Sequence, residues 1–560
     1  MKETLINYYP GNYHQIVEIA WKKTQQDDVA RRIRAKDYKL WSPSPEEIVN
    51  RLGWLDAPGQ ILKKADYIRE TIAPLAAKKI KDVILLGMGG SGLAAEVFNK
   101  VFGAQTGYPQ LTVLDTTNPA IISNIAQKID WDKTIFIVSS KSGTTMEITS
   151  LFHFFYNEAR KIKGGGAGEH FIFITDEGSP LAKTVRELSP FHVFLNNPDI
   201  GGRYSALSFF GIVPAAIIGI DVNKLLHNAQ TAAGAADETG IMLGAALGAL
   251  ACQGRDKLTL YLPWRWKSFG DWLEQLIAES TGKEGKGILP VLDEPEADVS
   301  LYENDRVFVF FQNENDNFSR IKDLNAAGHP VVTLKIREDF DLASQMYIWE
   351  MATAVAAYFL GVNPFDQPDV EATKIHTRTM IEAYKDKRKE KEKEKENEEK
   401  PVIATAEGHV YGDTKEKTIS EALNNFLMQK KMGDYTCLQI YLNASAEVDS
   451  ATAKLRAAIF KKYKLPVTCG YGPRYLHSTG QLHKGGANCG LFIQLTEENL
   501  INIPIPDELE KESSSLSFGE LLAAQAQGDW QALKEKGRRI IRIHCPNDAA
   551  AFLKKLAAAL

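Results

Sequence analysis

Residues 83–97 read VILLGMGGSGLAAEV, and residues 134–149 read TIFIVSSKSGTTMEIT. Each stretch is a short apolar run, then a loop of small or hydroxyl-bearing residues, then a helix-like pattern. This order is typical of a buried parallel strand whose loop opens a helix. Loops at the carboxyl ends of parallel strands bind ligands in α/β proteins, and the free N–H groups of helix N-termini attract anions. We therefore expect both loops to converge on one phosphate group.

The candidate binding residues of the two loops are glycines, which let the backbone approach a phosphate, and polar side chains that can donate to it. They are Gly89, Gly90, Ser91, Ser140, Lys141, Ser142, Thr144 and Thr145. Tight turns that merely need small residues are one alternative. A dinucleotide site is another, since Gly87, Gly89 and Gly92 fit G-x-G-x-x-G and Asp115 follows about 20 residues on. The hydroxyl-rich second loop favours a phosphorylated sugar, because a dinucleotide site does not need it.

The bulk composition limits the classes of function. A chain of 560 residues is too long for one core, so two to four domains are expected. The net charge of −5 gives no reason to expect a nucleic acid partner. The five cysteines are scattered without a C-x-x-C pair, which predicts a reducing compartment and argues against zinc. Because no apolar signal core is present and the apolar stretch 206–220 is too short to span a membrane, we expect a cytoplasmic protein without membrane contact.

Two charged residues beyond the loops are candidates for catalysis. Arg203 lies in GGRYS before the apolar helix expected at 206–220, where a buried cation requires an anion. A local contact with Asp199 is the alternative. Glu279 comes four residues after Gln275 in the amphipathic stretch SFGDWLEQLIAES, so both side chains project from one helix face. A carboxylate near a helix C-terminus in a cleft suits a general base, and a solvated surface glutamate is the alternative.

Two later segments also carry polar candidates. Gln367 lies in a proline-containing turn, and Lys374 follows seven residues later in the first turns of a helix, where a solvated lysine is the alternative. His477 and His483 lie in the glycine-rich stretch PRYLHSTGQLHKGGANCG. Two histidines six residues apart with no carboxylate nearby make a poor metal site. A structural turn explains the glycines of this stretch but not its cluster of polar donors.

Several of these motifs resemble those of the glucose-6-phosphate isomerase family, which is built from sugar isomerase domains. SSKSGTT is similar to the family's phosphate-binding loop, and GMGGSG is similar to its first glycine loop. The resemblance implies that Arg203 stabilises an enediolate and that Gln275 and Glu279, in QLIAESTGK, form the base motif. In FDQPDVEATK it implies that Gln367 binds phosphate and that Lys374 acts near the sugar ring oxygen. The likeness extends from about residue 40 to the C-terminus.

The chain departs from the ordinary family pattern in its histidine. That pattern has a catalytic histidine between the base and the lysine, where this chain has only His329, at an expected strand start. The C-terminal glycine-rich stretch instead resembles the isomerase portion of fused transaldolase/glucose-6-phosphate isomerase proteins. We expect this segment to fold back, or to reach a neighbouring subunit, and to bring His483 or His477 to the ring oxygen. Of the two, His483 is preferred.

Apolar runs that alternate with helical patterns predict an α/β fold. The resemblance implies two tandem doubly wound sheets of the sugar-isomerase, flavodoxin-like type, followed by a C-terminal α/β unit. The expected division is an N-terminal helical segment at 1–62 that packs on the first domain, sugar isomerase domains at 63–230 and 231–380, a charged linker at 381–403, and a C-terminal domain at 404–560.

The expected function is the reversible isomerisation of glucose 6-phosphate to fructose 6-phosphate through a cis-enediolate, in glycolysis and gluconeogenesis. No metal or organic cofactor is expected, because the substrate supplies its own carbonyl. The expected partners are a hexose 6-phosphate and a second copy of the chain in a homodimer. Three alternatives stay open: a non-catalytic phosphosugar-binding regulatory protein, a nicotinamide dehydrogenase, and an isomerase that also accepts mannose 6-phosphate.

Overall fold

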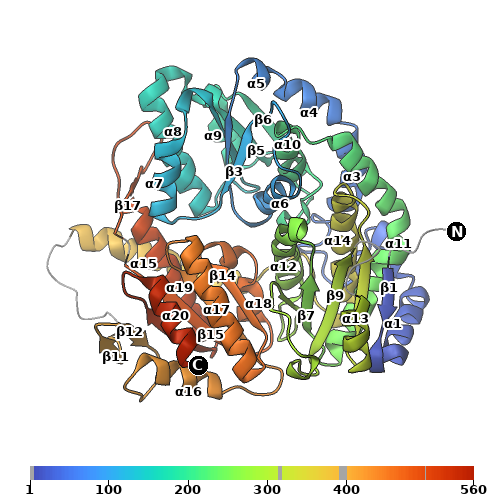
Figure 1. Ribbon diagram of the computed structural model, residues 1–560. Coiled ribbons are helices and arrows are strands. Elements are labelled where there is room, and N and C mark those ends of the chain that lie inside the picture. Colours follow the sequence, from blue (N-terminus) through green and yellow to red (C-terminus); the bar gives the residue numbers. More distant parts are fainter. Residues whose placement is uncertain (1–5, 313–317, 390–399, 499) are drawn as a thin grey trace.

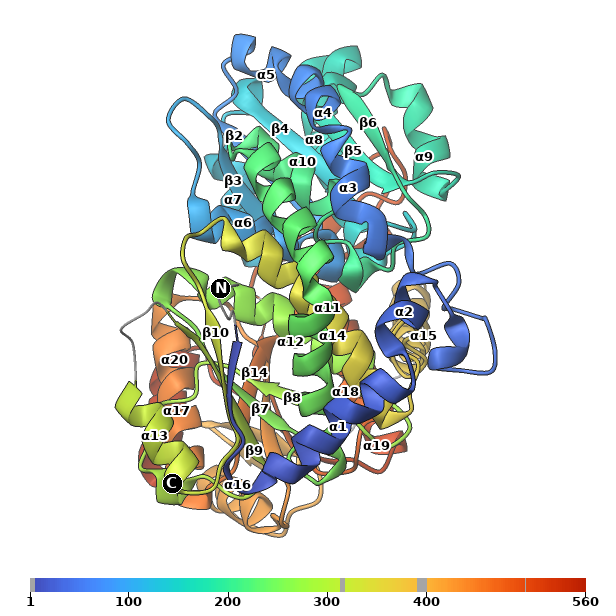
Figure 2. The same cartoon turned by 90° about the vertical axis from the view of Figure 1, so that its right-hand side faces the viewer.

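The computed structural model describes residues 6–312, 318–389, 400–498 and 500–560. Three large sheets with helices against their faces form three units. Figure 1 shows the first unit above, with the second and the C-terminal unit beside each other below it, and Figure 2 shows the same layers from the side. The predicted α/β class, with two tandem sheets and a C-terminal α/β unit, is confirmed.

The first sheet has the strand order β3-β2-β4-β5-β6, and all its strand pairs are parallel. Every residue of β4 and β5 is buried, as expected for strands covered by helices on both faces. The strands are β2 (Asp82–Gly87), β3 (Gln110–Leu114), β4 (Thr134–Ser139), β5 (Phe171–Asp176) and β6 (His192–Asn196). The helices are α4 (Ala65–Ile72), α5 (Pro74–Ala77), α6 (Leu93–Phe102), α7 (Pro119–Lys128), α8 (Met146–Lys163), α9 (Pro180–Thr184) and α10 (Phe209–Ile217).

The strand order of this sheet explains why its two loops converge. The chain runs from β2 outward to β3 and then returns to the other side of β2 as β4, so β2 and β4 are neighbours and Gly87 pairs with Ser139. Their loops therefore leave the same edge of the sheet side by side in space. Such a reversal of strand order is where open α/β sheets form a ligand-binding crevice.

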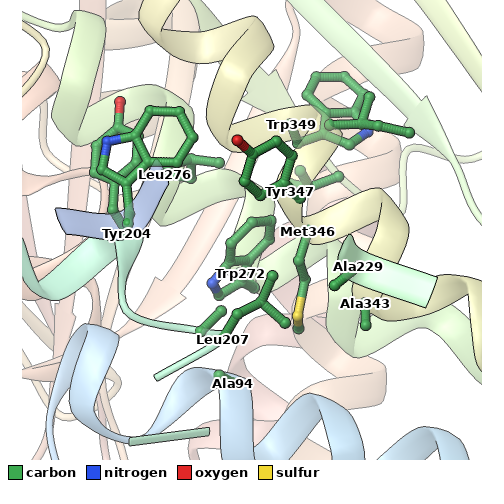
Figure 3. Packing of buried hydrophobic residues seen from close by; sticks show 14 of the residues in the cluster. Ala94, Tyr204, Leu207, Ala229, Trp272, Leu276, Ala343, Met346, Tyr347 and Trp349 are labelled. Atoms are coloured by element: carbon green, nitrogen blue, oxygen red, sulfur yellow. The ribbon is translucent and has the colours of Figure 1, made fainter. Parts of the chain in front are cut away.

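The second sheet has the order β1-β10-β9-β7-β8, and its strands are parallel except for β1. The strands of the second unit itself are β7 (Lys257–Tyr261), β8 (Leu289–Val291), β9 (Arg306–Gln312) and β10 (Val331–Lys335). Its helices are α11 (Val222–Cys252), α12 (Lys267–Thr281), α13 (Phe318–Ala326) and α14 (Asp341–Leu360). The main core continues across both units. In Figure 3, Trp272 of α12 and Met346 of α14 lie close to Leu207 and to Ala94 of α6.

The N-terminal segment corrects an expectation. It was predicted to be helical and to pack on the first domain, but β1 (Ile6–Tyr9) joins the edge of the second sheet, antiparallel to β10. The segment then passes through α1 (His14–Gln26), α2 (Val29–Arg34) and α3 (Ala57–Leu62). Only its later part reaches the first unit, where Leu52 forms a bridge with Ile200. The segment therefore links both units and supports the chain just before Arg203.

The third sheet belongs to the C-terminal unit and has the order β11-β12-β18-β15-β13-β14. Its strands are β11 (Ile403–Thr405), β12 (Gly408–Tyr411), β13 (Tyr435–Tyr441), β14 (Val467–Tyr471), β15 (Gly490–Thr496) and β18 (Arg539–His544). A separate two-stranded sheet consists of β16 (Pro504–Ile505) and β17 (Leu516–Ser517). The helices are α16 (Ile419–Met428), α17 (Ala446–Tyr463), α18 (Gly480–Gly485), α19 (Phe518–Glu535) and α20 (Ala549–Ala559). This unit shares a core with each neighbour: Phe518 of α19 packs with the first unit, and Phe460 of α17 packs with the second.

The region of the predicted charged linker, 381–403, is divided in the structure. Its beginning continues the helix α15 (Val370–Lys389), and residues 390–399 lie outside the described residues. No single helix in the described part of the chain is long and apolar enough to cross a membrane. The two bent parts of α11, 222–234 and 238–252, meet the length and composition criteria only when taken together. Apolar side chains from both parts, among them Leu226 and Leu243, are buried in the protein core.

Candidate functional site

A cavity of about 790 Å³ opens where the three units meet. Its lining comes from the two loops of the first sheet, from the segment around Arg203, from α12 and α15, and from the C-terminal unit. Most residues predicted from the sequence line it together: Gly89, Gly90, Ser91, Lys141, Ser142, Thr144, Thr145, Arg203, Gln275, Glu279, Gln367, Lys374 and His477. Ser140 and His483 do not line it.

The hydroxyl-rich loop forms one wall of the cavity and leads into α8. The Ser142 and Thr144 hydroxyls lie 2.9 Å apart, and Thr145 is the N-cap residue of α8 without using its side chain as a cap. Ser140 shapes the loop from beneath, since its hydroxyl accepts the N–H of Gly143 at 3.1 Å. The Lys141 ammonium contacts Asp176 and donates to the Pro198 carbonyl. The loop thus presents hydroxyls and a helix N-terminus to the cavity, a combination that suits a phosphate.

The first glycine loop, η4 (Gly89–Ser91), passes very close to Gln275 of the second unit and to Gly202 of its own unit. Gly89 has a φ of +53°, and a Cβ added there would lie 2.7 Å from the Gln275 amide nitrogen. A Cβ on Gly90 would lie 2.0 Å from the carbonyl oxygen of Gly202. The glycines are required because the backbone passes this close to η8 (Gly202–Tyr204) and α12.

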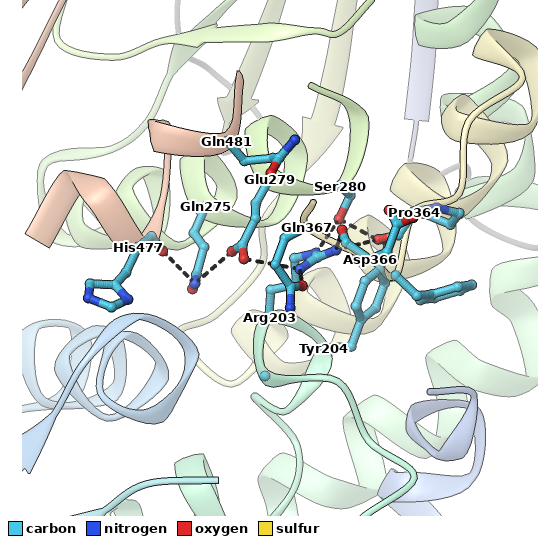
Figure 4. A network of polar contacts seen from close by, with 12 residues as sticks. Arg203, Tyr204, Gln275, Glu279, Ser280, Pro364, Asp366, Gln367, His477 and Gln481 are labelled. Carbon is cyan, nitrogen blue, oxygen red and sulfur yellow. Dashed lines mark hydrogen bonds and ion pairs between the residues drawn. The ribbon is translucent and has the colours of Figure 1, made fainter. Parts of the chain in front are cut away.

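Arg203 lies in η8 and has only 4% of its side chain exposed. Its guanidinium donates to the Ser280 hydroxyl, the Gln367 amide oxygen and the Pro364 and Asp366 carbonyls, all within 2.9 Å. One nitrogen also lies 3.1 Å from a Glu279 carboxylate oxygen, as Figure 4 shows. The arginine therefore holds α12 and the 364–367 turn against the first unit. Its anion is Glu279 rather than the alternative Asp199.

Glu279 and Gln275 project from one face of α12, as the spacing predicts. The Gln275 amide nitrogen donates to the second Glu279 oxygen at 3.1 Å and to the His477 carbonyl at 2.7 Å. Both carboxylate oxygens of Glu279 thus have a fixed partner, and 14% of the side chain stays exposed, toward the cavity. The alternative of a solvated surface glutamate is wrong. α12 ends at Gly282, which is required for space rather than for a left-handed turn, since a Cβ there would lie 2.4 Å from the Leu482 Cα.

His477 closes the cavity from the C-terminal unit, at the end of η11 (Arg474–His477). Its Nε2 lies 2.9 Å from a carboxylate oxygen of Glu147, in the first turn of α8. Burial by itself opposes protonation of the ring, but the charge of Glu147 and the hydrogen bond to it outweigh burial and raise the pKa of His477. The pKa of Glu147 is lowered, because the His477 charge outweighs the effect of burial there too. Both directions favour an ion pair.

Lys374 lines the cavity from α15, the helix that follows the 364–367 turn, and lies one helical turn after the start of that helix. Its charge acts on both members of the Glu147–His477 pair. The turn before α15 is itself fixed by Lys283, whose ammonium donates to the Asn363 and Asp366 carbonyls. Burial and the nearby Arg203 charge lower the pKa of Lys283 to about 8.

Comparison with known proteins finds relatives with one described function. A family model described as phosphoglucose isomerase matches residues 65–285, which include both loops, Arg203, Gln275 and Glu279. Glucose-6-phosphate isomerase from Lactobacillus helveticus is 29% identical over 383 residues, covering 58% of this chain and 84% of that protein. The Staphylococcus saprophyticus enzyme of the same name is 26% identical over 426 residues, covering 65% and 94%. Over residues 65–285 the chain is thus similar to the phosphoglucose isomerase family.

Two solved structures share the fold of this chain. A hypothetical protein from Thermus thermophilus has a TM-score of 0.57 at 23% identity, covering 67% of this chain and 99% of that chain. A glucose-6-phosphate isomerase from Chlamydia trachomatis has a TM-score of 0.55 at 17% identity, covering 68% and 88%. These likenesses concern the fold alone. The resemblance to fused transaldolase/isomerase proteins stays a prediction.

The geometry corrects the preference for His483. Its side chain is 1% exposed, lies among Tyr435, Tyr475 and Phe492, and has no hydrogen-bond partner on either ring nitrogen. Burial lowers its pKa well below the usual value. Both histidines belong to one folded-back segment, but η11 directs His477 into the cavity and α18 directs His483 into the C-terminal core.

Sequence reasoning missed two residues of the site. Glu147 belongs to the quoted stretch 134–149, but a glutamate in the first turn of a helix is ordinary because it complements the helix dipole. Gln525 belongs to no recognised motif, yet its amide donates to the same Glu147 oxygen at 2.8 Å. No local sequence signal marks either residue as part of the cavity. Within the described residues, no group of three or more His, Cys, Asp or Glu side chains is arranged to hold a metal.

Proposed function

We propose that this chain interconverts glucose 6-phosphate and fructose 6-phosphate. The observation that carries the proposal is one cavity with a hydroxyl-lined helix N-terminus at one wall, the Arg203–Glu279 pair at 3.1 Å, and the Glu147–His477 pair on the C-terminal side. An aldose–ketose isomerase needs these three functions: an anchor for the phosphate, a base beside a cation, and a group that opens the ring.

The phosphate end of the substrate binds at Ser142, Thr144 and Thr145, with the N-terminus of α8 behind it. Gln367 completes this end in our proposal, although its oxygen accepts from Arg203 in this structure. The sugar then extends toward α12 and His477. Anchoring a remote phosphate is useful because it fixes the position of the reacting carbons.

Ring opening requires a proton for the ring oxygen and removal of a proton from the hydroxyl at C1. His477, held protonated by Glu147, supplies the first proton, and Lys374 lies beside it in the cavity. The proton of the C1 hydroxyl passes to solvent or to the Glu147–His477 pair, so ring opening adds no proton to the sugar and removes none. The open sugar has the free carbonyl that the next step needs.

Glu279 then removes the proton from C2, and the carbonyl oxygen at C1 gains negative charge. The proton of the C2 hydroxyl passes to the oxygen at C1, and Glu279 returns its proton to C1, so that the carbonyl forms at C2. Arg203 already touches Glu279, so one cation neighbours the negative charge both on the carboxylate and on the enediolate. Such placement avoids reorganisation when the charge moves. The Gln275 bond keeps the second carboxylate oxygen in a fixed direction.

The direct test follows the conversion of glucose 6-phosphate in a coupled assay, in both directions, with and without EDTA. Turnover that is unaffected by EDTA is expected. Absence of turnover under all conditions contradicts the proposal and favours the non-catalytic phosphosugar-binding protein. That alternative has no need of the Arg203–Glu279 pair. Mannose 6-phosphate belongs in the same assay, because the two C2 epimers share one enediolate.

A cytoplasmic location and the homodimer stay part of the proposal. The five cysteines are all unpaired, which suits a reducing compartment. His477 reaches the cavity of its own chain, so a partner subunit is not needed to supply it. Light scattering on the purified protein decides between a monomer and a dimer.

His477→Gln should slow the turnover of glucose 6-phosphate by about 100-fold, because proton transfer to the ring oxygen loses its donor. An analogue of glucose 6-phosphate without the C5 hydroxyl cannot close the six-membered ring. Its isomerisation should be far less affected by the substitution, because no such ring has to be opened. Steady-state rates with both sugars measure the difference. His483→Gln is the matched control from the same segment and should keep the wild-type ratio of the two rates. If His483→Gln changes the ratio of the two rates and His477→Gln does not, His483 is the group that opens the ring.

Ser142→Ala combined with Thr145→Ala should raise KM by about 10- to 100-fold with a small change in kcat, because donors to a charged phosphate are lost. Inhibition by inorganic phosphate should weaken in parallel. Ser123→Ala, on α7 of the same unit and outside the cavity, is the control and should leave both values unchanged. A loss confined to kcat would mean that the phosphate binds elsewhere.

A further inference from the structure

A series of hydrogen bonds leads from Thr117 through Gln525 of the C-terminal unit to the Glu147–His477 pair. The Thr117 hydroxyl donates to the Gln525 amide oxygen at 2.7 Å, and the Gln525 amide nitrogen donates to Glu147 at 2.8 Å. The same Glu147 oxygen meets His477 Nε2 at 2.9 Å. Thr117 follows β3 of the first unit, whereas Gln525 lies on α19 of the C-terminal unit. Three elements distant in sequence thus meet at one carboxylate.

The direction of this series is fixed by chemistry. A glutamine amide can be turned so that its oxygen and nitrogen exchange places, but then its oxygen would face the Glu147 carboxylate, and two acceptors would repel. The Thr117 hydroxyl can donate to the amide oxygen and is fully buried. The amide therefore has to direct its N–H groups toward Glu147.

The position of Gln525 is fixed as firmly as its orientation. Its side chain is 3% exposed. One turn further along α19, a Cβ on Gly528 would lie 2.5 Å from the Thr377 hydroxyl of α15 and 3.0 Å from the Thr377 backbone nitrogen, so the two helices pack closely together. α15 also carries Lys374. α19 thus holds the amide at Glu147 and supports the lysine helix at the same time.

We propose that Gln525 is a positioning residue, which keeps Glu147 ionised and directed at His477 and so sets the pH range in which the histidine opens the sugar ring. The inference rests on the proposed function and deepens it. Gln525 acts through Glu147 rather than on the substrate. The C-terminal unit thereby contributes His477 and also the group that tunes it.

Several other charged groups face the Glu147–His477 pair and affect its protonation. Glu279 of α12 and Glu147 itself raise the proton affinity of His477, whereas Lys374 of α15 lowers it. Asp115, after β3, also interacts with His477. Because these groups are the same in a Gln525 variant, a change in the pH profile of that variant reports on the amide.

Gln525→Leu removes the amide that donates to Glu147. The carboxylate then becomes more basic and attracts the His477 proton more strongly, so both apparent pKa values of the pair should rise. We expect the pH profile of kcat for glucose 6-phosphate to move up by about one unit, with little change in KM. Thr117→Val should produce a smaller shift of the pH profile in the same direction. Thr117→Ser keeps the hydroxyl and should keep the wild-type profile.

The matched control is Gln494→Leu. Gln494 is a fully buried glutamine of the same unit whose amide donates to the Ala526 carbonyl, next to Gln525 on α19. The Gln494→Leu substitution weakens the packing of α19 but removes no contact of Glu147. An equal shift of the pH profile in this control would overturn the proposal, because the effect would then be structural.

A second readout is independent of turnover. An NMR titration of isotope-labelled histidine, with His477 assigned from the His477→Gln variant, should show the same upward shift in Gln525→Leu. An unchanged titration and an unchanged profile would overturn the role of Gln525 while isomerase activity persists. A rise confined to KM would overturn it too, by showing that Gln525 contacts the sugar. A wild-type protein without activity would instead defeat the proposed function, and the titration would still decide the inference.

Discussion

We expect Glu279→Gln to lower kcat for glucose 6-phosphate by at least about 100-fold, because an amide cannot accept the proton that moves between C2 and C1. The amide keeps the size of the side chain, and its oxygen can still accept from Arg203, so KM should change little. The variant should also stop the exchange of the C2 proton with deuterated solvent. NMR detection of this exchange tests the proton transfer separately from ring opening.

Glu274→Gln, on the same helix, is the matched control. Glu274 accepts from the Ser478 hydroxyl at 3.2 Å, and burial together with the Asp271 charge raises its pKa to about 8. Below that pH the carboxyl is mostly protonated, so glutamine resembles it and kcat should stay near the wild-type value at neutral pH. Similar losses in both variants would mean that α12 had been disturbed and that Glu279 is not the base.

Arg203→Lys should have a comparably large effect. A lysine has one nitrogen in place of the planar fork that reaches Ser280, Gln367, two carbonyls and Glu279 together. Loss of charge stabilisation at the enediolate should lower kcat by about 100- to 1000-fold. Buried carbonyls left without a donor should also cost about 1–3 kcal/mol of unfolding free energy. Steady-state kinetics and denaturant unfolding measure the two effects separately.

Arg255→Lys supplies the control for burial alone. Arg255 is 3% exposed and donates to the Arg306 carbonyl in the second unit, outside the cavity. This variant should lose stability and keep its kcat. If Arg203→Lys behaves in the same way, the arginine holds the units together without acting on the intermediate.

The parts of the site that could be predicted are those encoded by local patterns. The two loops follow strands whose apolar runs are unmistakable, and the strand order then forces both loops to one crevice. The four-residue spacing of Gln275 and Glu279 places them on one helix face in any α-helix. These features depend on few residues and on no distant contact.

The parts that could not be predicted depend on contacts between distant segments. His477 and His483 share one short stretch, and only the packing of η11 and α18 decides which ring enters the cavity. β1 is a four-residue strand whose partner β10 lies more than 300 residues away, so no local pattern assigns it to the second sheet.

The close backbone contacts at the cavity also bear on how such a chain can change during evolution. Gly89 against His477, Gly282 against Leu482, and Gly528 against Thr377 leave little or no room for a side chain where the units meet. A C-terminal unit exchanged by recombination with a distant homologue would have to match these contacts at once. The histidine that we propose as the ring-opening group and the glutamine that contacts its partner Glu147 are therefore inherited together with the surfaces that position them, rather than as a module that can be transferred alone.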